Sequence, residues 1–586
     1  MGRRSRLDTV SSDAFDYVIV GAGSAGCVLA ARLSEQPGIT VCLLEAGPRD
    51  RNPSLHVPAG YIKNLFDPAL TWPFQTEPGE QTGGRQQATT QGRVLGGSSA
   101  INGLVYNRGQ RADYDNWAQS GLRGWDFASV LPYFQRTERR AGGDDAHRGR
   151  AGPLTVSNTA WQSPLCHAFA AGAESIGLPV NADYNGRQQY GVGPFQYTIV
   201  GRRRMSSATA FLRPARRRAN LAVRTGAQVS RIVFTGRRAT GVRYERGGQT
   251  REVTARREVI LAAGAINTPK LLQISGVGPA WLLNELGVPV VHDVPGVGEN
   301  LRDHYSIRLS ARVKNAITIN DLSRGVRFAR EVARWAVGRP SILSLSPVLM
   351  HAFCKSQAGL ADSDLQLSFV PGSLRAGFVG MLDTMPGMSC GGYQQRPEST
   401  GYVRARSAAS ADAPAIQPNY LATEGDRRAI VAVMHKARAL LQTPAMAPYY
   451  DGETFPGAAL QRDDELLDFA RHNGSTVYHL VGSARMGPDS DPMAVADPWL
   501  RVRGLGGLRV IDASVMPSLP SGNTNAPTLM IAERGADLIL GRDPLPAARL
   551  DDEPEPSKGD HHGDHTTGTH GDRSRILANG RAACPE

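Results

Sequence analysis

Cysteine is scarce in this chain of 586 residues, which has only six, and none of them forms a C-x-x-C pair. Zinc sites and disulfide frameworks need closely or regularly spaced cysteines, so the pattern excludes both. We therefore expect free thiols, no metal site and a cytoplasmic, reducing location.

Long apolar runs are also missing. No segment approaches the roughly 18–20 apolar residues of a membrane-spanning helix, so no integral membrane segment is expected. Residues 1–13 are polar and lack the apolar stretch of a secretory signal. They read as a flexible N-terminus, and no amphipathic membrane anchor is evident in the sequence.

Lysine is rare in a chain whose net charge is +12, since only six of its 66 basic residues are lysine. The arginine clusters at 202–204 and 216–218 are short and have no interleaved aromatic residues. We therefore predict no nucleic-acid partner. The opposite interpretation, a basic nucleic-acid-binding protein, predicts a colourless protein with salt-sensitive retention on DNA.

The first glycine-rich segment is the strongest motif. An apolar run at 17–20 precedes Gly21-Ala22-Gly23-Ser24-Ala25-Gly26, and a helix of small residues follows. A second apolar run ends at Glu45, 19 residues after Gly26. This is the arrangement of a dinucleotide-binding βαβ unit. Gly21 would make the tight turn, Gly23 would admit a pyrophosphate, and Glu45 would accept hydrogen bonds from a ribose.

The length exceeds that of a single hydrophobic core, so we expect more than one domain. Segments 220–225 and 229–234 read as adjacent strands. Segment 258–264 is another apolar strand, ending in glycine, that should join the sheet of residues 17–20, and 507–512 resumes the same pattern. Residues 526–540 read as a helix. Residues 310–465 differ in composition and read as a separate domain. Residues 551–586 are polar and predict a disordered tail, whose histidines could bind a metal only incidentally.

Four further motifs follow in order: 92–106, which contains Gly-Gly-Ser-Ser-Ala-Ile-Asn-Gly; 264–278; 478–487, which begins Tyr-His; and 512–528. Together with the first motif, the chain from about 14 to 544 resembles the glucose–methanol–choline (GMC) family of FAD-dependent oxidoreductases. The resemblance implies an α/β plus α+β fold, in which a discontinuous, Rossmann-like FAD-binding domain carries a substrate domain built on an antiparallel sheet.

The resemblance also implies domain boundaries. Residues 14–310 would form the FAD-binding domain, with a substrate-domain insertion at about 155–200. Residues 311–465 would be mainly substrate domain, 466–544 a C-terminal FAD-binding and catalytic segment, and 545–586 a disordered tail.

The resemblance assigns FAD-binding positions throughout the chain. The residues implied to contact FAD are Gly21, Ala22, Gly23, Ser24, Gly26, Glu45, Ala46, Val94, Gly97, Ser98, Asn102, Gly103, Leu104, Val105, Val229, Asp512, Ala513 and Asn525. From the residues alone, Val229 reads as an ordinary strand residue. Gly96-Gly97-Ser98 reads as a flexible loop. In some members a histidine attaches FAD covalently where this chain has Ile101, so we expect non-covalent FAD.

For catalysis the resemblance points to His479 as the base that takes the alcohol proton, and histidine suits this role because its pKa lies near neutral pH. Asn523 matches the partner position, where members have His or Asn, and Tyr478 would line the substrate pocket. Considered without this context, His479 in an apolar strand reads as a structural residue, and Tyr478 as core packing.

The expected reaction is oxidation of a primary alcohol to the aldehyde, with hydride transfer to FAD. Choline dehydrogenase is one alternative. Choline-oxidising relatives carry a glutamate near a position where this chain has Leu349, in a stretch without an acid whose only aromatic residue is Phe353. We therefore favour an apolar alcohol. A second alternative is a flavin-containing lyase, of the hydroxynitrile lyase or photodecarboxylase type. The electron acceptor (oxygen, a quinone or an artificial dye) and the oligomeric state stay open.

Overall fold

The fold is that of a computed structural model, which describes residues 13–375 and 380–550. The elements below belong to one compact unit that ends at Ala548. The predicted N-terminal arm up to residue 12 and the predicted tail from residue 551 lie outside the described residues.

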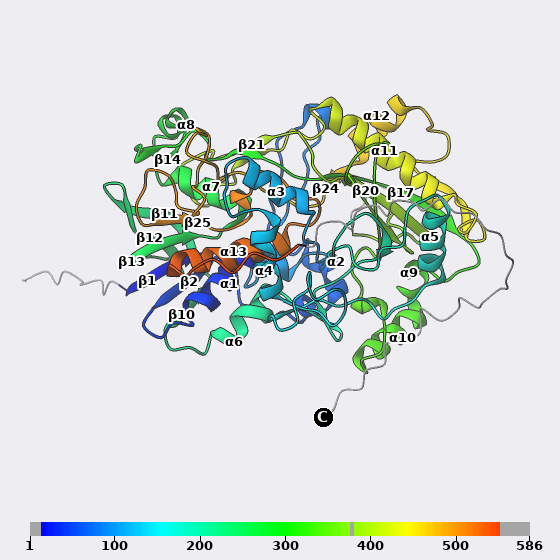
Figure 1. The fold of residues 1–586 in the computed structure, drawn as a ribbon, viewed down its shortest axis with the longest axis horizontal. Coiled ribbons are helices and arrows are strands. Elements are labelled where there is room, and N and C mark those ends of the chain that lie inside the picture. Colours follow the sequence, from blue (N-terminus) through cyan, green and yellow to red (C-terminus); the bar gives the residue numbers. More distant parts are fainter. Residues whose placement is uncertain (1–12, 376–379, 551–586) are drawn as a thin grey trace, which may run out of the picture. The chain divides into compact units, whose positions relative to one another are not determined.

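A mixed sheet carries the first glycine-rich motif (Figure 1). Its order is β10-β2-β1-β13-β12-β11, with β25 also paired to β13. β10, β2, β1, β13 and β25 run parallel, while β12 lies antiparallel to both β13 and β11. The strands are β1 (Asp13–Val20), β2 (Val41–Glu45), β10 (Leu221–Thr225), β11 (Gln228–Thr235), β12 (Arg238–Arg246), β13 (Gln249–Leu261) and β25 (Leu508–Val510).

Two expectations about this sheet are confirmed and one is wrong. Val20 pairs with Leu261, and Leu261 with Val510, so the three distant segments do share the sheet. The segments at 220–225 and 229–234 are not adjacent, because β10 pairs with β2 while β11 pairs with β12. The link between them turns at Gly226, whose φ is +63°. After this turn the chain enters an antiparallel meander at the other end of the sheet.

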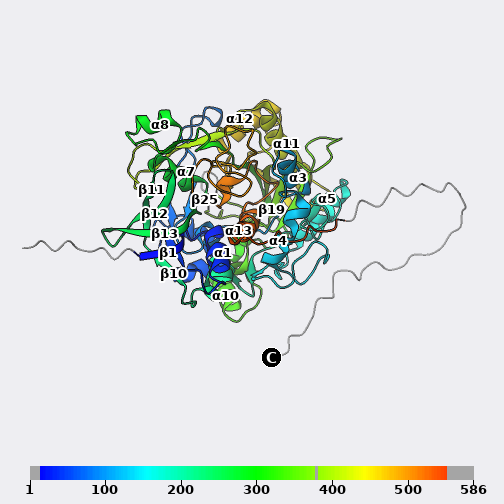
Figure 2. The ribbon, with the colours of Figure 1, turned by 60° about the vertical axis from the view of Figure 1, so that its left-hand side comes forward.

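Helices α1 (Ser24–Leu33) and α13 (Asn525–Leu540) lie side by side next to this sheet (Figures 1 and 2). Buried Glu533 of α13 accepts hydrogen bonds from Arg32 of α1, with Nη2 at 2.8 Å, and pairs with Arg136. At the other end, Ser24 donates to Asn525 Oδ1 at 2.7 Å. The predicted helix at 526–540 is therefore confirmed, and its first turn lies beside the first glycine-rich motif.

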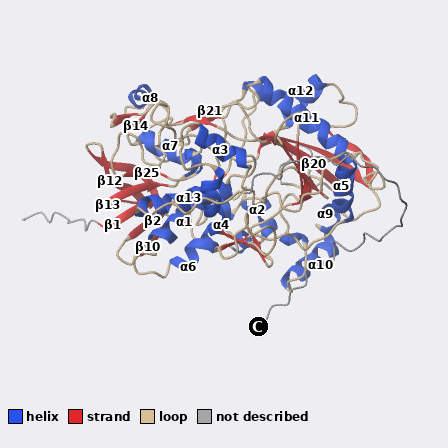
Figure 3. Ribbon diagram, viewed as in Figure 1, coloured by secondary structure: helices blue, strands red, loops and turns tan. Residues whose placement is uncertain are grey.

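The second large sheet is antiparallel, as the resemblance implied, with the order β23-β17-β20-β19-β18-β7 and β24 paired to β17 (Figure 3). Its strands are β7 (Gly191–Pro194), β17 (Tyr305–Val313), β18 (Met350–Cys354), β19 (Leu365–Val370), β20 (Gly387–Gln394), β23 (Tyr450–Phe455) and β24 (Ser475–Thr476). β7 comes from the stretch assigned to the substrate-domain insertion.

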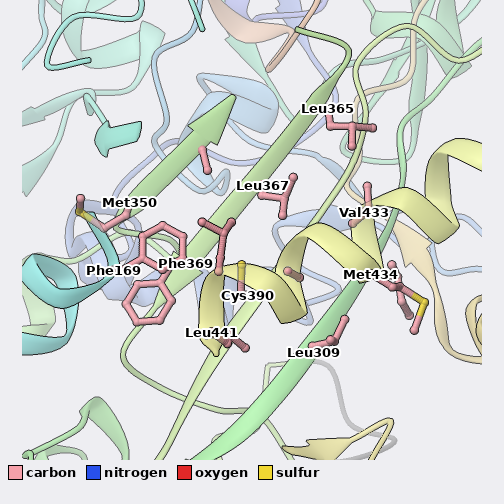
Figure 4. Packing of buried hydrophobic residues seen from close by; sticks show 14 of the residues in the cluster. Phe169, Leu309, Met350, Leu365, Leu367, Phe369, Cys390, Val433, Met434 and Leu441 are labelled. Carbon is pink, nitrogen blue, oxygen red and sulfur yellow. The ribbon is translucent and has the colours of Figure 1, made fainter. Parts of the chain in front are cut away.

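An apolar cluster closes one face of the antiparallel sheet (Figure 4). Helix α11 (Glu424–Leu441) buries Val433, Met434 and Leu441 against sheet residues such as Leu309 and Cys390. Phe169 of helix α5 (Pro164–Ser175) stacks on Phe369, with ring centroids 4.4 Å apart. Because this face is covered, the other face of the sheet is left to line a cavity.

The remaining helices and short strands connect these layers. The helices are α2 (Tyr61–Asn64), α3 (Arg111–Gln119), α4 (Phe127–Thr137), α6 (Arg213–Ala215), α7 (Gly264–Ile274), α8 (Ala280–Glu285), α9 (Ile319–Leu322), α10 (Gly325–Ala336) and α12 (Asp463–Asn473). The short strands are β3 (Thr71–Trp72), β4 (Gln91–Gly92), β5 (Glu138–Arg139), β6 (Leu154–Thr155), β8 (Ile199–Val200), β9 (Arg203–Arg204), β14 (Val277–Gly278), β15 (His292–Asp293), β16 (Glu299–Leu301), β21 (Gly401–Arg404) and β22 (Ala415–Gln417).

Within the described ranges, none of the helices is both long and apolar enough to cross a bilayer.

Candidate active site

Two glycine-rich segments meet backbone to backbone at the carboxyl end of β1. A Cβ atom on Gly97, whose φ is +52°, would lie 2.7 Å from Gly23 Cα. The Gly96 N–H also donates to the Ala22 carbonyl at 2.8 Å. Such close approach is possible only without side chains. Residues 97–100, where a flexible loop was expected, instead form a turn of 3₁₀ helix.

Glu45 lies at the end of β2, as the motif predicts, and it is buried. Its carboxylate accepts hydrogen bonds from the backbone N–H groups of Ala22, at 2.9 Å, and Gly47, at 2.8 Å. Burial raises its pKa to about 7, although these hydrogen bonds oppose the shift. Each carboxylate oxygen keeps a lone pair for a further donor, so a ribose hydroxyl can still be accepted.

A cavity of about 810 Å³ runs from these loops to the open face of the antiparallel sheet. Of the residues predicted to bind the cofactor or substrate or to act in catalysis, the cavity is lined by Gly21, Gly23, Ser24, Glu45, Ala46, Gly97, Ser98, Asn102, Gly103, Leu104, Val105, Val229, Tyr478, His479, Asp512, Ala513, Asn523 and Asn525. Its size lies within the range of ligand sites in proteins.

Ala22, Gly26 and Val94 do not line the cavity. Ala22 instead holds Glu45 through its N–H. A Cβ on Gly26 would lie 1.9 Å from the Gly21 carbonyl oxygen, so this glycine lets α1 approach the preceding loop. Val94 packs in a small apolar cluster with Leu55. These three residues help to position the loops without lining the cavity themselves.

Asp512 lines the cavity, but its carboxylate is already occupied. Oδ2 accepts from the Gly264 N–H and the Thr268 hydroxyl, and Oδ1 accepts from the Ser514 N–H and hydroxyl, all at 2.5–2.8 Å. Burial raises its pKa above the usual range while these hydrogen bonds oppose the shift. Asp512 thus fixes the turn after β25 beside the start of α7.

Two cavity residues have left-handed backbone although they are not glycine. Tyr478 has φ +66° and Leu104 has φ +70°. Such conformations cost energy and persist where the surroundings impose them, often at functional sites. The Tyr478 N–H donates to Thr476 Oγ1 at 2.8 Å, and the Leu104 N–H donates to Asn102 Oδ1 at 3.1 Å.

The imidazole of His479 lies at the centre of a hydrogen-bond chain. Its Nδ1 is 2.9 Å from Nδ1 of His304, and its Nε2 is 2.9 Å from the amide nitrogen of Asn523. His304 Nε2 in turn lies 2.7 Å from the carbonyl oxygen of Gln395. His479 follows β24 in an irregular segment, so the expectation that it belongs to a strand is wrong.

Burial keeps both rings neutral. It lowers the pKa of His479 to about 3 and the pKa of His304 well below its usual value. A positive charge on His479 would lower the pKa of His304 further. A neutral imidazole has one N–H and one lone pair. The Gln395 carbonyl can only accept, so His304 carries its proton on Nε2. His304 Nδ1 must then accept from His479 Nδ1–H, which leaves the lone pair of His479 on Nε2, beside Asn523.

A buried carboxylate fixes the backbone of both histidines. Asp303 Oδ1 accepts from the N–H of His304 at 2.9 Å and from the N–H of His479 at 2.8 Å. Its Oδ2 accepts from the hydroxyls of Tyr420, at 2.5 Å, and Thr476. Burial raises the pKa of Asp303 to about 6, and the four hydrogen bonds favour its charged form.

Sequence reasoning missed Asp303 and His304. They lie next to each other between β16 and β17, directly before a strand in which apolar and polar residues alternate. This position at the start of a strand is the feature of the sequence that could have identified them. Arg308 was also missed. It projects from β17 into the cavity, and its guanidinium lies 5.3 Å from the centre of the Phe455 ring. Partial burial lowers its pKa, but its usual value is so high that it stays charged.

Leu349, which stands near the position of the glutamate in choline-oxidising relatives, does not line the cavity. It is buried in the apolar cluster of the antiparallel sheet. Val348, its neighbour, does line the cavity. Phe353 is likewise packed in a separate apolar cluster. Among the described residues, the only carboxylates on the cavity wall are Glu45 and Asp512.

Comparison with known proteins agrees with this geometry. A family model described as GMC oxidoreductase matches residues 15–306, and a second one with the same description matches residues 397–532. The chain belongs to the GMC oxidoreductase family. The family therefore accounts for both the glycine-rich segments and the segment that carries His479.

Individual members of the family resemble the chain over nearly its whole length. Human "Choline dehydrogenase, mitochondrial" is 41% identical over 91% of this chain and 91% of its own. "Oxygen-dependent choline dehydrogenase" of Brucella anthropi is 40% identical over 92% of this chain and 97% of its own. The solved structure of pyridoxine 4-oxidase from Mesorbium loti superposes with a TM-score of 0.81, at 31% identity, over 90% of this chain and 100% of its own.

As a GMC oxidoreductase, the protein is an FAD-dependent enzyme that acts on CH–OH donors. The residues present fit this cofactor. The Gly23–Gly97 contact forms a cradle that a Cβ would fill, α13 begins at the cavity wall, and the side-chain oxygen of Asn523 is buried without a partner. A helix N-terminus offers partial positive charge to an anionic group.

The first prediction concerns the glycine cradle. Gly97→Ala should prevent FAD retention, because the added Cβ would meet Gly23 Cα at 2.7 Å and force the two loops apart. FAD per protein after gel filtration measures the effect. Gly38→Ala is the control, since nothing lies within 4 Å of a Cβ there. A Gly97→Ala protein that keeps its full yellow colour would contradict the assignment.

The second prediction concerns the position of the proton on His479. His304→Leu leaves the His479 Nδ1–H without an acceptor, a loss of about 1–3 kcal/mol for a buried donor, so anaerobic flavin reduction should slow roughly 5- to 150-fold. His304→Gln should retain most of the rate, because an amide can accept from His479 and donate to Gln395. Equal loss in both variants, with FAD still bound, would instead indicate a purely steric role.

Proposed function

We propose that the protein oxidises an uncharged, largely apolar primary alcohol to the aldehyde, with His479 as the base. The observation that carries the proposal is the lone pair on His479 Nε2, which the Gln395–His304 chain fixes at the cavity wall. Bound FAD would supply the two-electron acceptor for the hydride that leaves the alcohol carbon.

In the proposed reaction, Nε2 of His479 takes the hydroxyl proton. The resulting imidazolium keeps its Nδ1–H on His304, so the lone pair of that ring stabilises the new charge. The amide of Asn523 lies 2.9 Å from Nε2 and can donate to the alcohol oxygen as it becomes negative. Because the pKa of His479 is lowered to about 3, the base is neutral and ready at pH 7.

The residues implied to bind FAD would divide the cofactor between them. The segment from Gly21 to Ser24 and the Gly97–Ser98 turn would take the pyrophosphate side, Glu45 the ribose, and the segment from Asn102 to Val105 would lie under the isoalloxazine ring. Buried Ile101 offers no nucleophile for a covalent link, which supports dissociable FAD.

The preference for an uncharged alcohol over choline rests on charge. Arg308 places a fixed cation on the cavity wall, and the two carboxylates there are already held by protein N–H and hydroxyl groups. A quaternary ammonium would be repelled by Arg308 and would find little available negative charge on the carboxylates of Glu45 and Asp512. The names of the curated relatives favour choline, which is therefore the second candidate.

We also propose a cytoplasmic location. The described cysteines, Cys27, Cys42, Cys166, Cys354 and Cys390, are all unpaired and buried, which suits a reducing compartment.

The third prediction tests the base. His479→Ala should slow anaerobic flavin reduction by an alcohol by about 10²–10⁴-fold while FAD stays bound. Stopped-flow loss of flavin absorbance measures the rate, and the visible spectrum of the resting enzyme reports the bound cofactor. Unchanged reduction in the variant would refute the role. Failure of every alcohol to bleach the wild-type flavin would favour the lyase alternative.

The fourth prediction tests the substrate class. Wild-type enzyme should show a higher kcat/KM for benzyl alcohol than for choline. Arg308→Gln should raise the choline-to-benzyl alcohol ratio of kcat/KM about three- to tenfold, because it removes the like charge. Arg246→Glu, in an exposed hairpin that does not line the cavity, changes the net charge but not the cavity wall and should leave the ratio unchanged. A choline preference in the wild type would overturn the assignment.

A further inference from the structure

Helix α10 (Gly325–Ala336) presents an apolar face to solvent. Val326 is 87% exposed, Val332 is 41% exposed, and Val337, directly after the helix, is 71% exposed. Ala329, Ala333 and Ala336 are exposed along the same face, at helical spacing. No amphipathic anchor is evident from the sequence, but this helix has an apolar face that is exposed.

The helix is held in this orientation by its other side. Glu331 is buried, and its carboxylate accepts from the Ile342 N–H at 2.9 Å. Trp335 is half-buried and donates its indole N–H to the Arg202 carbonyl at 3.1 Å. Since the polar Glu331 anchors the helix inward, the exposed valines are a fixed feature of the fold rather than the result of a loosely docked helix.

Exposed apolar side chains continue from α10 to an opening of the active-site cavity. Phe328 of α10 is 39% exposed and Phe66 is 53% exposed, and both line the cavity. A Cβ on Gly380 would lie 2.9 Å from Phe66, and Met381 beside it is 48% exposed. The cavity therefore reaches the surface within an apolar patch. We call Val326, Phe328, Val332, Val337, Phe66 and Met381 the α10 surface.

Arginines surround the α10 surface, which is bordered by Arg324, Arg327, Arg330, Arg334 and Arg339. Two of these arginines lie close to acids, since Arg327 is 3.9 Å from Asp321 and Arg334 is 3.6 Å from Glu331, whereas Asp383 pairs with Arg312. Arg324, Arg330 and Arg339 leave the border with an excess of positive charge. The patch thus combines an apolar centre with a positive border.

We propose that the α10 surface docks the protein onto an anionic lipid bilayer. The helix would lie in the plane of the interface, with its valines at the boundary of headgroups and acyl chains and its arginines among the anionic headgroups. A second copy of the chain fits less well, because a twofold contact through this patch would bring the two sets of arginines together.

Docking in this way has a consequence that rests on the proposed function. The mouth beside Phe66 and Phe328 would face the bilayer, so an apolar alcohol dissolved in the membrane could enter the cavity without crossing water. The surface itself depends only on the α10 contacts, so it can be tested separately from the chemistry.

The experiment is flotation of the FAD-loaded enzyme with vesicles of phosphatidylcholine alone or with about 30% phosphatidylglycerol, at roughly 0.1 M and 0.5 M salt. Wild type should float with the anionic vesicles and less so at high salt. Val326→Asp with Val332→Asp should lower the partition coefficient about tenfold or more, because two apolar contacts are lost. Arg327→Glu with Arg330→Glu should abolish the preference for anionic vesicles.

Matched controls change the same residue types elsewhere. Val290→Asp alters another exposed valine, and Arg246→Glu with Arg251→Glu reverses charges on the β12–β13 hairpin, at the opposite side in Figure 1. Both should bind vesicles like wild type. Retained FAD and unchanged reduction by benzyl alcohol in vesicle-free buffer would show that the α10 variants fold normally, whatever the natural substrate is.

Two results would overturn the proposal. One is equal vesicle binding, or none, for wild type and the Val326→Asp/Val332→Asp protein. The other is a dimer in sedimentation velocity that the same double variant abolishes without any vesicle binding, which would assign the α10 surface to a second copy. Absence of alcohol oxidation, by contrast, would sink the proposed function and leave the vesicle result standing.

Discussion

The arrangement of the active site depends on the hydrogen bonds that the carboxylate of Asp303 accepts. It accepts the backbone N–H of His304, which enters β17, and that of His479, which follows β24. These two histidines are 175 residues apart in the chain. One buried anion therefore fixes the spacing of two rings that must meet within hydrogen-bond distance. Its own burial is tolerable because the hydroxyls of Tyr420 and Thr476 complete its shell.

The same burial decides the chemistry of the rings. A protonated imidazole at either position would lose its hydration and face another histidine, so both stay neutral. In a chain of neutral imidazoles, the N–H of each ring must donate to an acceptor on the next group. The Gln395 carbonyl, which can only accept, sets the direction of donation at one end. At the other end, Nε2 of His479 is the acceptor that remains. Tertiary packing, rather than the histidine itself, thus determines which nitrogen of His479 carries the lone pair.

The sequence correctly predicted those features whose positions are fixed by residues close together in the chain. Gly21, Gly26 and Glu45 lie in a single βαβ unit, where strand, turn and helix fix their relative positions, and the structure agrees with that unit in detail. Long-range pairing was less accessible. Two strands that are neighbours in sequence, β10 and β11, lie at opposite ends of the sheet because a single turn at Gly226 sends the chain into the meander. His304 was overlooked because its partner His479 is 175 residues away and no local pattern connects them. The apolar face of α10 escaped notice since its spacing reads equally well as a buried helix, and only the contacts of Glu331 and Trp335 reveal which side faces inward.

Charge and apolarity in the cavity both favour the proposed class of substrate. Proton removal from an alcohol creates negative charge on its oxygen, and a wall that carries Arg308 favours that change while it disfavours a cationic substrate. The end of the cavity around His479 and Asn523 is polar, whereas the mouth is formed by aromatic side chains such as Phe66 and Phe328. An alcohol with one reactive hydroxyl and an apolar remainder satisfies both ends at once. Choline fits both ends less well than an apolar alcohol does. Its charged end would have to lie either beside the guanidinium of Arg308 or in the apolar mouth, where desolvation of an ion is costly.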